Sequence, residues 1–197
     1  MFLNSLSELI LSITAFAVFL IYFKKQPLYN RLVWGIFFAI LSIASLLAVL
    51  WYLGWDELSP IVESLRQLTA TLGPLGMLIG VWLLISHSIA TRFTFWATII
   101  TGTGLFLGLT AYRLSPLIQV VQPLCIVIAL LIACWGLLRR QKSALWVVFA
   151  MTILALSSKL RLELNPIAAF GPYHLLVAVS TLCLGKAVET EHKVLFK

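Results

Sequence analysis

Continuous apolar stretches of about 20 residues follow one another along the whole chain, and they limit the folds open to it. A helix of that length rises far enough to cross the hydrocarbon core of a bilayer. Of the 197 residues, 61% are hydrophobic and 11% are charged, whereas about 25% of residues are charged in an average soluble domain. A membrane β-barrel would need shorter segments of alternating polarity. We therefore predict an all-α integral membrane protein.

Seven such stretches are present, separated by short polar connections. The predicted spans cover residues 5–23, 32–53, 60–86, 93–112, 116–138, 143–160 and 167–188. The first stretch has no basic residue before its apolar run, which favours a retained helix over a cleaved signal. No internal repeat or soluble segment interrupts the series. We predict one seven-transmembrane-helix domain, residues 1–197.

Charge alternates between the two sets of connections. The basic set contains Lys24, Lys25, Arg31, Arg92, Arg139, Arg140, Lys142, Lys186, Lys193 and Lys197, and the opposite set contains Asp56, Glu57 and Glu63 with fewer cations. Basic residues are retained on the cytoplasmic side of a membrane. This pattern predicts an N-terminus outside and a C-terminus in the cytoplasm, and it explains the net charge of +7 without a nucleic-acid partner. A compact chain with short loops fits a bacterial inner (plasma) membrane.

Glycines at four-residue spacing indicate how the helices pack. Gly76 and Gly80 lie in the third span, and Gly104 and Gly108 lie in the fourth, together with Thr101 and Gly102. Small residues let membrane helices approach closely, so we expect spans three and four to meet tightly, with a dimer interface on the same motif as the alternative. Most tryptophans fall near span ends and are expected to form interfacial belts. The three cysteines lie within apolar segments and form no CxxC pair, so we expect them to be buried as small apolar residues.

Polar side chains inside the spans indicate where a site lies, because ionisable groups at membrane depth face a cavity or one another. On the predicted orientation most of them fall in the outer half, and the cytoplasmic half is plainer. We predict an outer ligand-binding pocket lined by Glu63, Arg66, Gln119, Gln122 and His174. Glu63 and Arg66 are three residues apart and close enough to pair. Residues nearer the loops are instead expected in the headgroup region: Arg113, Lys159, Arg161 and Glu163.

His174 is the strongest single candidate. Gly171 and Pro172 suit a helix start, which would place His174 in the second turn. His87 and His174 lie near opposite faces of a core about 30 Å thick, so they cannot share a metal ion or a haem. We predict no metal site, no cofactor and no catalytic residue. A serine nucleophile paired with His174 stays open, with Ser157, Ser158 and Ser180 as weak candidates.

Two segments resemble a known superfamily. The second span, "NRLVWGIFFAILSIASLLAVLWYLGW", and the last, "LNPIAAFGPYHLLVAVSTLCLGKAV", resemble the corresponding helices of the alkaline ceramidase and progestin/adipoQ receptor superfamily of seven-helix proteins. The resemblance implies a zinc site with one histidine ending the second helix and two histidines four apart in the seventh. Here the second helix ends in Trp51, Tyr52 and Leu53, and Ala178 stands four residues after His174. The departures imply that zinc-dependent hydrolysis has been lost.

Three functions follow as hypotheses. The first is a non-enzymatic membrane protein whose outer pocket binds a lipid or small amphiphile, or docks a membrane partner. The second is an intramembrane lipid hydrolase with a reduced form of the superfamily site. The third is a structural or assembly subunit of a membrane complex. Besides the lipid bilayer, the predicted partners are therefore a lipid or amphiphile ligand or another membrane protein.

Overall fold

Seven α-helices, joined by short connections, make up the described part of the chain. The computed structural model describes residues 2–112, 115–163 and 166–195. Its elements are α1 Phe2–Tyr22, α2 Leu28–Tyr52, the 3-10 turn η1 Asp56–Leu58, α3 Ser59–Ile85, α4 Arg92–Ala111, α5 Ser115–Leu138, α6 Lys142–Glu163 and α7 Pro166–Leu195. By length and composition, all seven helices are able to cross a membrane. The predicted all-helical class and the seven candidate spans are confirmed.

The last helix is longer than predicted at its C-terminal end. It runs to Leu195 rather than to residue 188, because the polar tail continues the helix instead of leaving it. It also begins at Pro166, so Pro172 lies inside the helix and His174 lies in its third turn rather than its second. Proline is tolerated inside membrane helices, where neighbouring groups satisfy the freed carbonyls.

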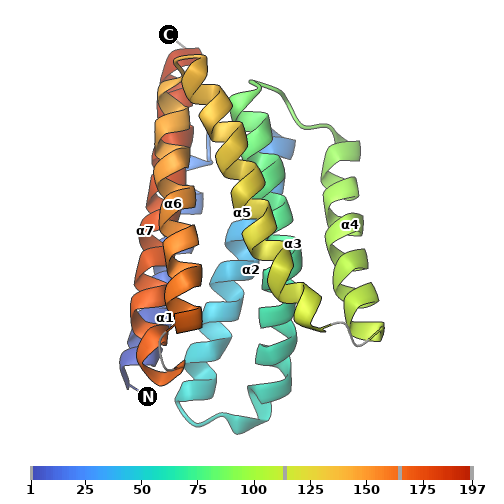
Figure 1. Ribbon diagram of the computed structural model, residues 1–197, viewed down its shortest axis with the longest axis vertical. Coiled ribbons are helices and arrows are strands. Elements are labelled where there is room, and N and C mark those ends of the chain that lie inside the picture. Colours follow the sequence, from blue (N-terminus) through green and yellow to red (C-terminus); the bar gives the residue numbers. More distant parts are fainter. Residues whose placement is uncertain (1, 113–114, 164–165, 196–197) are drawn as a thin grey trace.

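Six helices form a closed ring, and the remaining helix lies outside it. Going around the ring, α1 packs on α2, α2 on α3, α3 on α5, α5 on α6, α6 on α7, and α7 returns to α1. Figure 1 shows α4 standing apart on one side, where its main neighbour is α3. The two termini lie at opposite ends of the bundle (Figure 1). Helix α5 runs obliquely across the molecule, from the α4 side at its start to the α6 side at its end (Figure 1).

The expected contact between α3 and α4 is present, but the two four-residue glycine motifs do not make it. Gly76 and Gly80 face α2: a Cβ on Gly80 would lie 2.6 Å from the Trp34 ring. Around Gly104 and Gly108 nothing lies within 4 Å of such a Cβ. Of the small residues named from the sequence, Gly102 makes the close approach of α4 to α3, where an added Cβ would collide with Leu72 Cδ1. Packing inside the bundle therefore uses one motif, and the other faces outward.

Aromatic side chains fill the core where α1, α2 and α3 meet. Phe23 packs on Phe38 and Trp34, with ring centroids 5.0 and 5.2 Å apart. Trp34 is buried, so this tryptophan is a core residue and not part of an interfacial belt. The expectation that the cysteines are buried holds only in part: Cys125 is buried, Cys183 is half-buried and Cys134 is exposed. Exposure of Cys134 on α5 is compatible with an apolar surrounding, because a thiol is a weakly polar group.

Polar contacts close the end of the bundle that carries the C-terminus, which is less plain than the sequence indicated. Helix α3 ends in a Schellman motif, in which the Ser88 N–H donates to the Leu83 carbonyl at 3.0 Å and His87 takes the left-handed conformation, φ 53°. That conformation is unfavourable for a residue with a Cβ. It places the His87 ring against the buried carboxylate of Glu191.

Glu191 lies at the centre of this closure. Its second oxygen accepts a hydrogen bond from Ser143 Oγ at 2.6 Å, and Gln141 Nε2 lies 2.9 Å from His87 Nε2. Asn30 joins the same loop to α2, because its Oδ1 accepts the Ala90 N–H at 2.6 Å. These contacts hold the α3–α4 connection, the start of α6 and the end of α7 in one place. His192, also in this tail, has a side chain outside the described residues.

The two glycines of α4 offer a matched test of its packing. Gly102→Ala should lower the thermal unfolding temperature in detergent, because overpacking of a tight contact costs about 1–3 kcal/mol. Gly104→Ala, on the same helix, should be neutral or stabilising, because alanine favours a helix over glycine by up to about 1 kcal/mol. A larger loss for Gly104→Ala than for Gly102→Ala would contradict the open face described above.

The Glu191 contacts predict a second difference in stability. Glu191→Ala should destabilise the protein by about 2–4 kcal/mol, because it leaves His87 and Ser143 without their shared acceptor. Glu189→Ala is the control, since Glu189 pairs with Lys186 at 2.7 Å on a more exposed surface and exposed pairs contribute little. Thermal unfolding of both variants in one detergent measures the difference. Equal shifts would show that Glu191 is no more important than a surface carboxylate.

Candidate functional site

A buried carboxylate lies near the start of α1. Glu8 is 4% exposed, and it follows Ser7 in the polar first turns of α1, before the apolar rest of the helix. A charged group is costly to bury unless it is paired. Glu8 was not among the predicted site residues, because it lies at the start of the first predicted span among other polar residues: Asn4, Ser5 and Ser12 are its neighbours at helical spacings. The signal that points to it is a carboxylate inside a candidate span.

Glu8 meets two cationic or titratable side chains from other helices. Its Oε1 lies 3.1 Å from His174 Nε2 on α7 and 3.7 Å from Arg66 Nη2 on α3. The second nitrogen of His174, Nδ1, lies 3.2 Å from Ser7 Oγ. We call Ser7, Glu8, Arg66 and His174 the Glu8 cluster. Because each ring nitrogen of His174 has a partner, the imidazole is held in one orientation between two residues of α1.

Arg66 is the member of the Glu8 cluster that reaches the surface. Its side chain is 29% exposed, against 5% for Glu8 and 6% for His174. The guanidinium carbon lies 5.5 Å from the centre of the Trp51 ring at the end of α2, a cation–π distance. Arg66 therefore extends from α3 past α2 toward α1. The cluster joins helices that are far apart in the sequence at the end of the bundle opposite the C-terminus.

The five residues of the predicted pocket do not all converge. Arg66 and His174 both meet Glu8, so the structure brings these two together. Glu63 is exposed and accepts a hydrogen bond from Gln67 Nε2 at 3.2 Å, on the same helix. The predicted pairing of Glu63 with Arg66 is therefore replaced by an i,i+4 contact with Gln67, while Arg66 turns toward α1.

Gln119 and Gln122 lie on α5, which packs on α3, α4 and α6, whereas the Glu8 cluster is built on α1, α3 and α7. Gln119 is exposed and Gln122 is half-buried. Of the residues expected in the headgroup region, Lys159 is exposed. Arg113 lies outside the described residues, as do the side chains of Arg161 and Glu163. The spacing of two glutamines on one helix predicted a shared face but carried no information about which neighbour that face meets.

The three serines considered as nucleophiles are engaged by backbone carbonyls. Ser157 and Ser158 both donate to the Leu154 carbonyl, at 2.7 and 2.9 Å. Ser180 donates to the Ala150 carbonyl at 3.1 Å. The serine that contacts His174 is instead Ser7, whose Oγ also donates to the Asn4 carbonyl at 2.9 Å. Ser7 was not among the serines singled out from the sequence, because it lies 167 positions from His174.

The chemistry open to the Glu8 cluster follows from its groups. An arginine and a histidine can receive a phosphate or carboxylate, with Glu8 as their internal counter-ion. A hydroxyl, an imidazole and a carboxylate in line also form the arrangement that activates a serine. Among the residues that the structure describes, no group of three or more His, Cys, Asp or Glu side chains is placed to hold a metal ion. Ala178, where the superfamily's second zinc ligand would stand, is buried.

An apolar groove lies on the other flank of α3. It has a volume of about 340 Å³ and is lined by Pro60, Ile61, Ser64, Leu65, Leu68 and Phe106. Phe106 belongs to α4, so the groove lies between α3 and α4, while Arg66 turns toward α1 and α2. The groove is therefore separate from the Glu8 cluster, although both lie in the N-terminal half of α3.

Comparison with protein families finds a match to a model described as a family of unknown function (DUF6962), over residues 3–193. Comparison with curated proteins and with solved structures finds no match. The resemblance to the alkaline ceramidase and progestin/adipoQ receptor superfamily thus stays a prediction. Because the matching family model extends over nearly all seven helices, the chain belongs to the family of unknown function DUF6962.

Proposed function

We propose that this protein is a non-enzymatic polytopic membrane protein that binds the anionic headgroup of a lipid or small amphiphile at the Glu8 cluster. The observation that carries the proposal is a buried carboxylate, Glu8, held by Arg66 and His174 from two other helices. A charge at that depth is costly. A lipid-binding role explains why the chain keeps two cationic or titratable groups beside it.

Glu8 acts in this proposal as an internal substitute for the ligand. Arg66 Nη2 lies 3.7 Å from the carboxylate, longer than the about 2.7–2.9 Å of a strong charge-assisted hydrogen bond. A phosphate or carboxylate that reached the partly exposed Arg66 side chain would offer two oxygens to the planar fork of its guanidinium. Binding would then compete with Glu8 for Arg66, while His174 keeps Glu8 in place.

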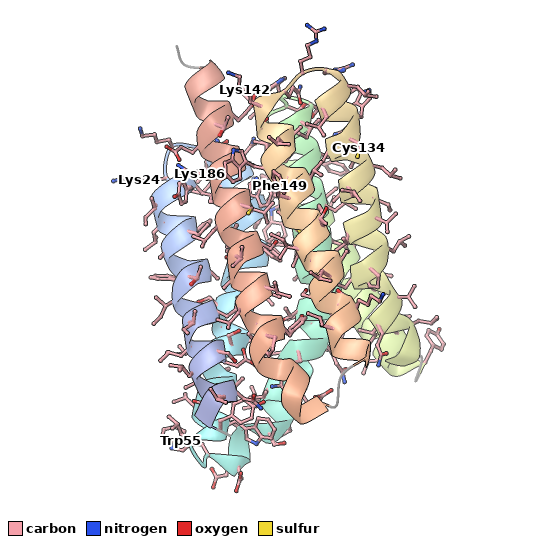
Figure 2. The ribbon with its side chains drawn as sticks, turned by 60° about the vertical axis from the view of Figure 1, so that its left-hand side comes forward. Lys24, Trp55, Cys134, Lys142, Phe149 and Lys186 are labelled. Carbon is pink, nitrogen blue, oxygen red and sulfur yellow. The ribbon has the colours of Figure 1, made fainter. Side chains whose placement is uncertain are left out.

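The same proposal includes the orientation and the membrane. With the N-terminus outside, the Glu8 cluster lies in the outer half of a bacterial inner membrane, and its ligand reaches it from the outer leaflet. The charge distribution supports this, since Asp56 and Glu57 lie in the connection beside the cluster and the lysine-rich connections lie at the other end. Lys24, Lys142 and Lys186 lie toward one end of the bundle and Trp55 lies at the other (Figure 2).

Ligand retention tests the proposal. Native mass spectrometry of the protein purified in mild detergent should find a retained anionic lipid or amphiphile. Arg66→Ala should reduce its occupancy about tenfold, the effect of losing one strong charge-assisted contact. Glu8→Gln, which keeps the side-chain shape but removes the competing charge, should retain at least as much ligand as the wild type.

Arg92→Ala is the matched control for charge, because Arg92 begins α4 at the opposite end of the bundle. It should leave the retained ligand unchanged. The proposal is wrong if the wild type retains no ligand and if added anionic lipid binds Arg66→Ala, His174→Ala and wild type equally.

A second candidate function, intramembrane lipid hydrolysis, is favoured by one observation: His174 lies between Ser7 Oγ and Glu8 Oε1, at 3.2 and 3.1 Å. In this reading Ser7 Oγ attacks an ester or amide carbonyl and its proton passes to His174 Nδ1. That proton then leaves with the departing alcohol or amine, and water releases the acyl group from Ser7. The function ranks second because Ser7 is buried and its Oγ also donates to the Asn4 carbonyl.

A fluorophosphonate probe separates the two candidates, because it labels activated serines. Hydrolysis predicts labelling of the wild type that is lost in Ser7→Ala and in His174→Ala. Ser180→Ala should leave the labelling intact, since Ser180 bonds a backbone carbonyl of α6. Absence of any label on the folded wild-type protein would remove the hydrolase candidate and leave ligand binding.

A further inference from the structure

Two tryptophans from different helices stack on the outside of the bundle, at the end opposite the Glu8 cluster. The rings of Trp82 on α3 and Trp135 on α5 lie 6.4 Å apart between centroids, with planes only 6° from parallel. They are 47% and 37% exposed. Each lies about one turn before its helix ends, at Ile85 and Leu138. This depth is where tryptophan sits between the hydrocarbon and the headgroups of a bilayer.

An arginine covers one of these rings. The guanidinium carbon of Arg139 lies 3.7 Å from the centre of the Trp135 ring, a close cation–π contact. Arg139 is exposed and follows the last residue of α5. A guanidinium that stacks by its face presents its N–H donors along its edge, the geometry that binds phosphate oxygens in pairs. Trp82, Trp135 and Arg139 thus form a layered group of two parallel rings and a guanidinium, which we call the platform, with the cation at its polar end.

The charges around this platform are mostly positive. The same end of the bundle carries Lys24, Lys25, Arg92, Arg140, Lys142 and Lys186, and Lys24, Lys142 and Lys186 can be followed in Figure 2. Its two carboxylates are engaged within the protein: Glu189 pairs with Lys186, and Glu191 contacts His87 and Ser143. The platform therefore faces a region of positive potential, which attracts anionic lipid.

Apolar residues continue the surface away from the arginine. Ile128 and Leu131, two turns and one turn before Trp135 on α5, are 37% and 64% exposed, so the apolar side of the platform extends toward the middle of the helix and the cationic side lies at the helix end. A phospholipid has the same order of groups, with acyl chains on one side and a phosphate on the other.

We propose that Trp82, Trp135 and Arg139 form a binding site for an anionic phospholipid, with the phosphate on the Arg139 guanidinium and an acyl chain along the stacked rings. The site stands apart from the function proposed above, because it uses another end of the bundle and none of the Glu8 cluster. It fixes α5 against α3, the pair of helices that the stacked rings join.

Binding of a defined lipid tests this site. Native mass spectrometry with titrated phosphatidylglycerol should give an apparent Kd about tenfold higher for Arg139→Gln than for the wild type, as expected when one charge-assisted contact is lost. Trp135→Leu should weaken binding in the same direction while leaving the charge unchanged. Phosphatidylcholine should bind the wild type more weakly and show little dependence on either substitution.

Arg92→Gln is the matched control: it removes one exposed arginine from the same end of the bundle and should bind phosphatidylglycerol as the wild type does. Equal weakening by Arg92→Gln and Arg139→Gln would overturn the site in favour of diffuse attraction. Weakening by Arg66→Gln but not by Arg139→Gln would also overturn it and assign the lipid to the Glu8 cluster. Competition by soluble glycerol phosphate as effective as by the lipid would show that the apolar platform contributes nothing.

Discussion

The requirement that every polar group find a partner inside an apolar surrounding governs this protein at each level. In a bilayer an unsatisfied backbone group costs several kcal/mol, so a spanning segment folds as a helix. The same requirement acts on side chains: Ser157, Ser158 and Ser180 donate to helix carbonyls. It acts most strongly on Glu8 and Glu191, the carboxylates that are buried among the described side chains. Glu8 is held by Arg66 and His174, and Glu191 is held by His87 and Ser143.

These two carboxylates lie at opposite ends of the bundle and have different partners. Glu191 closes the C-terminal end by joining the α3–α4 connection to α6 and α7, and both contacts hold these segments together. Glu8 differs, because one of its partners, Arg66, reaches the surface and lies over an aromatic ring. The partial exposure of Arg66 therefore separates the Glu8 cluster, which is proposed to bind a ligand, from the Glu191 contacts, which hold helices together.

Helix α4 shows that a glycine motif in the sequence does not by itself mark a packing contact. Both α3 and α4 carry glycines four residues apart, yet only those of α3 lie against another helix, α2. The single Gly102 makes the close contact between α4 and α3. Membrane helices associate through shape, without a hydrophobic difference between lipid and neighbour. A small residue therefore permits a close approach but does not select the helix that makes it, and the remaining face of α4 is left open.

Helix number and the asymmetry of charge were determined by the sequence itself, because they depend on local apolar length and on the cost of moving charge across a bilayer. The same local reasoning identified Arg66 and His174, since each is an ionisable residue inside an apolar segment. Only the tertiary structure decided that both meet Glu8, that Ser7 contacts His174 from 167 positions away, and that Glu63 turns to Gln67 instead. Those outcomes depend on which helices become neighbours in the ring. The complementary shapes of whole helix faces decide which helices become neighbours. Residue spacing on a single helix does not encode that choice.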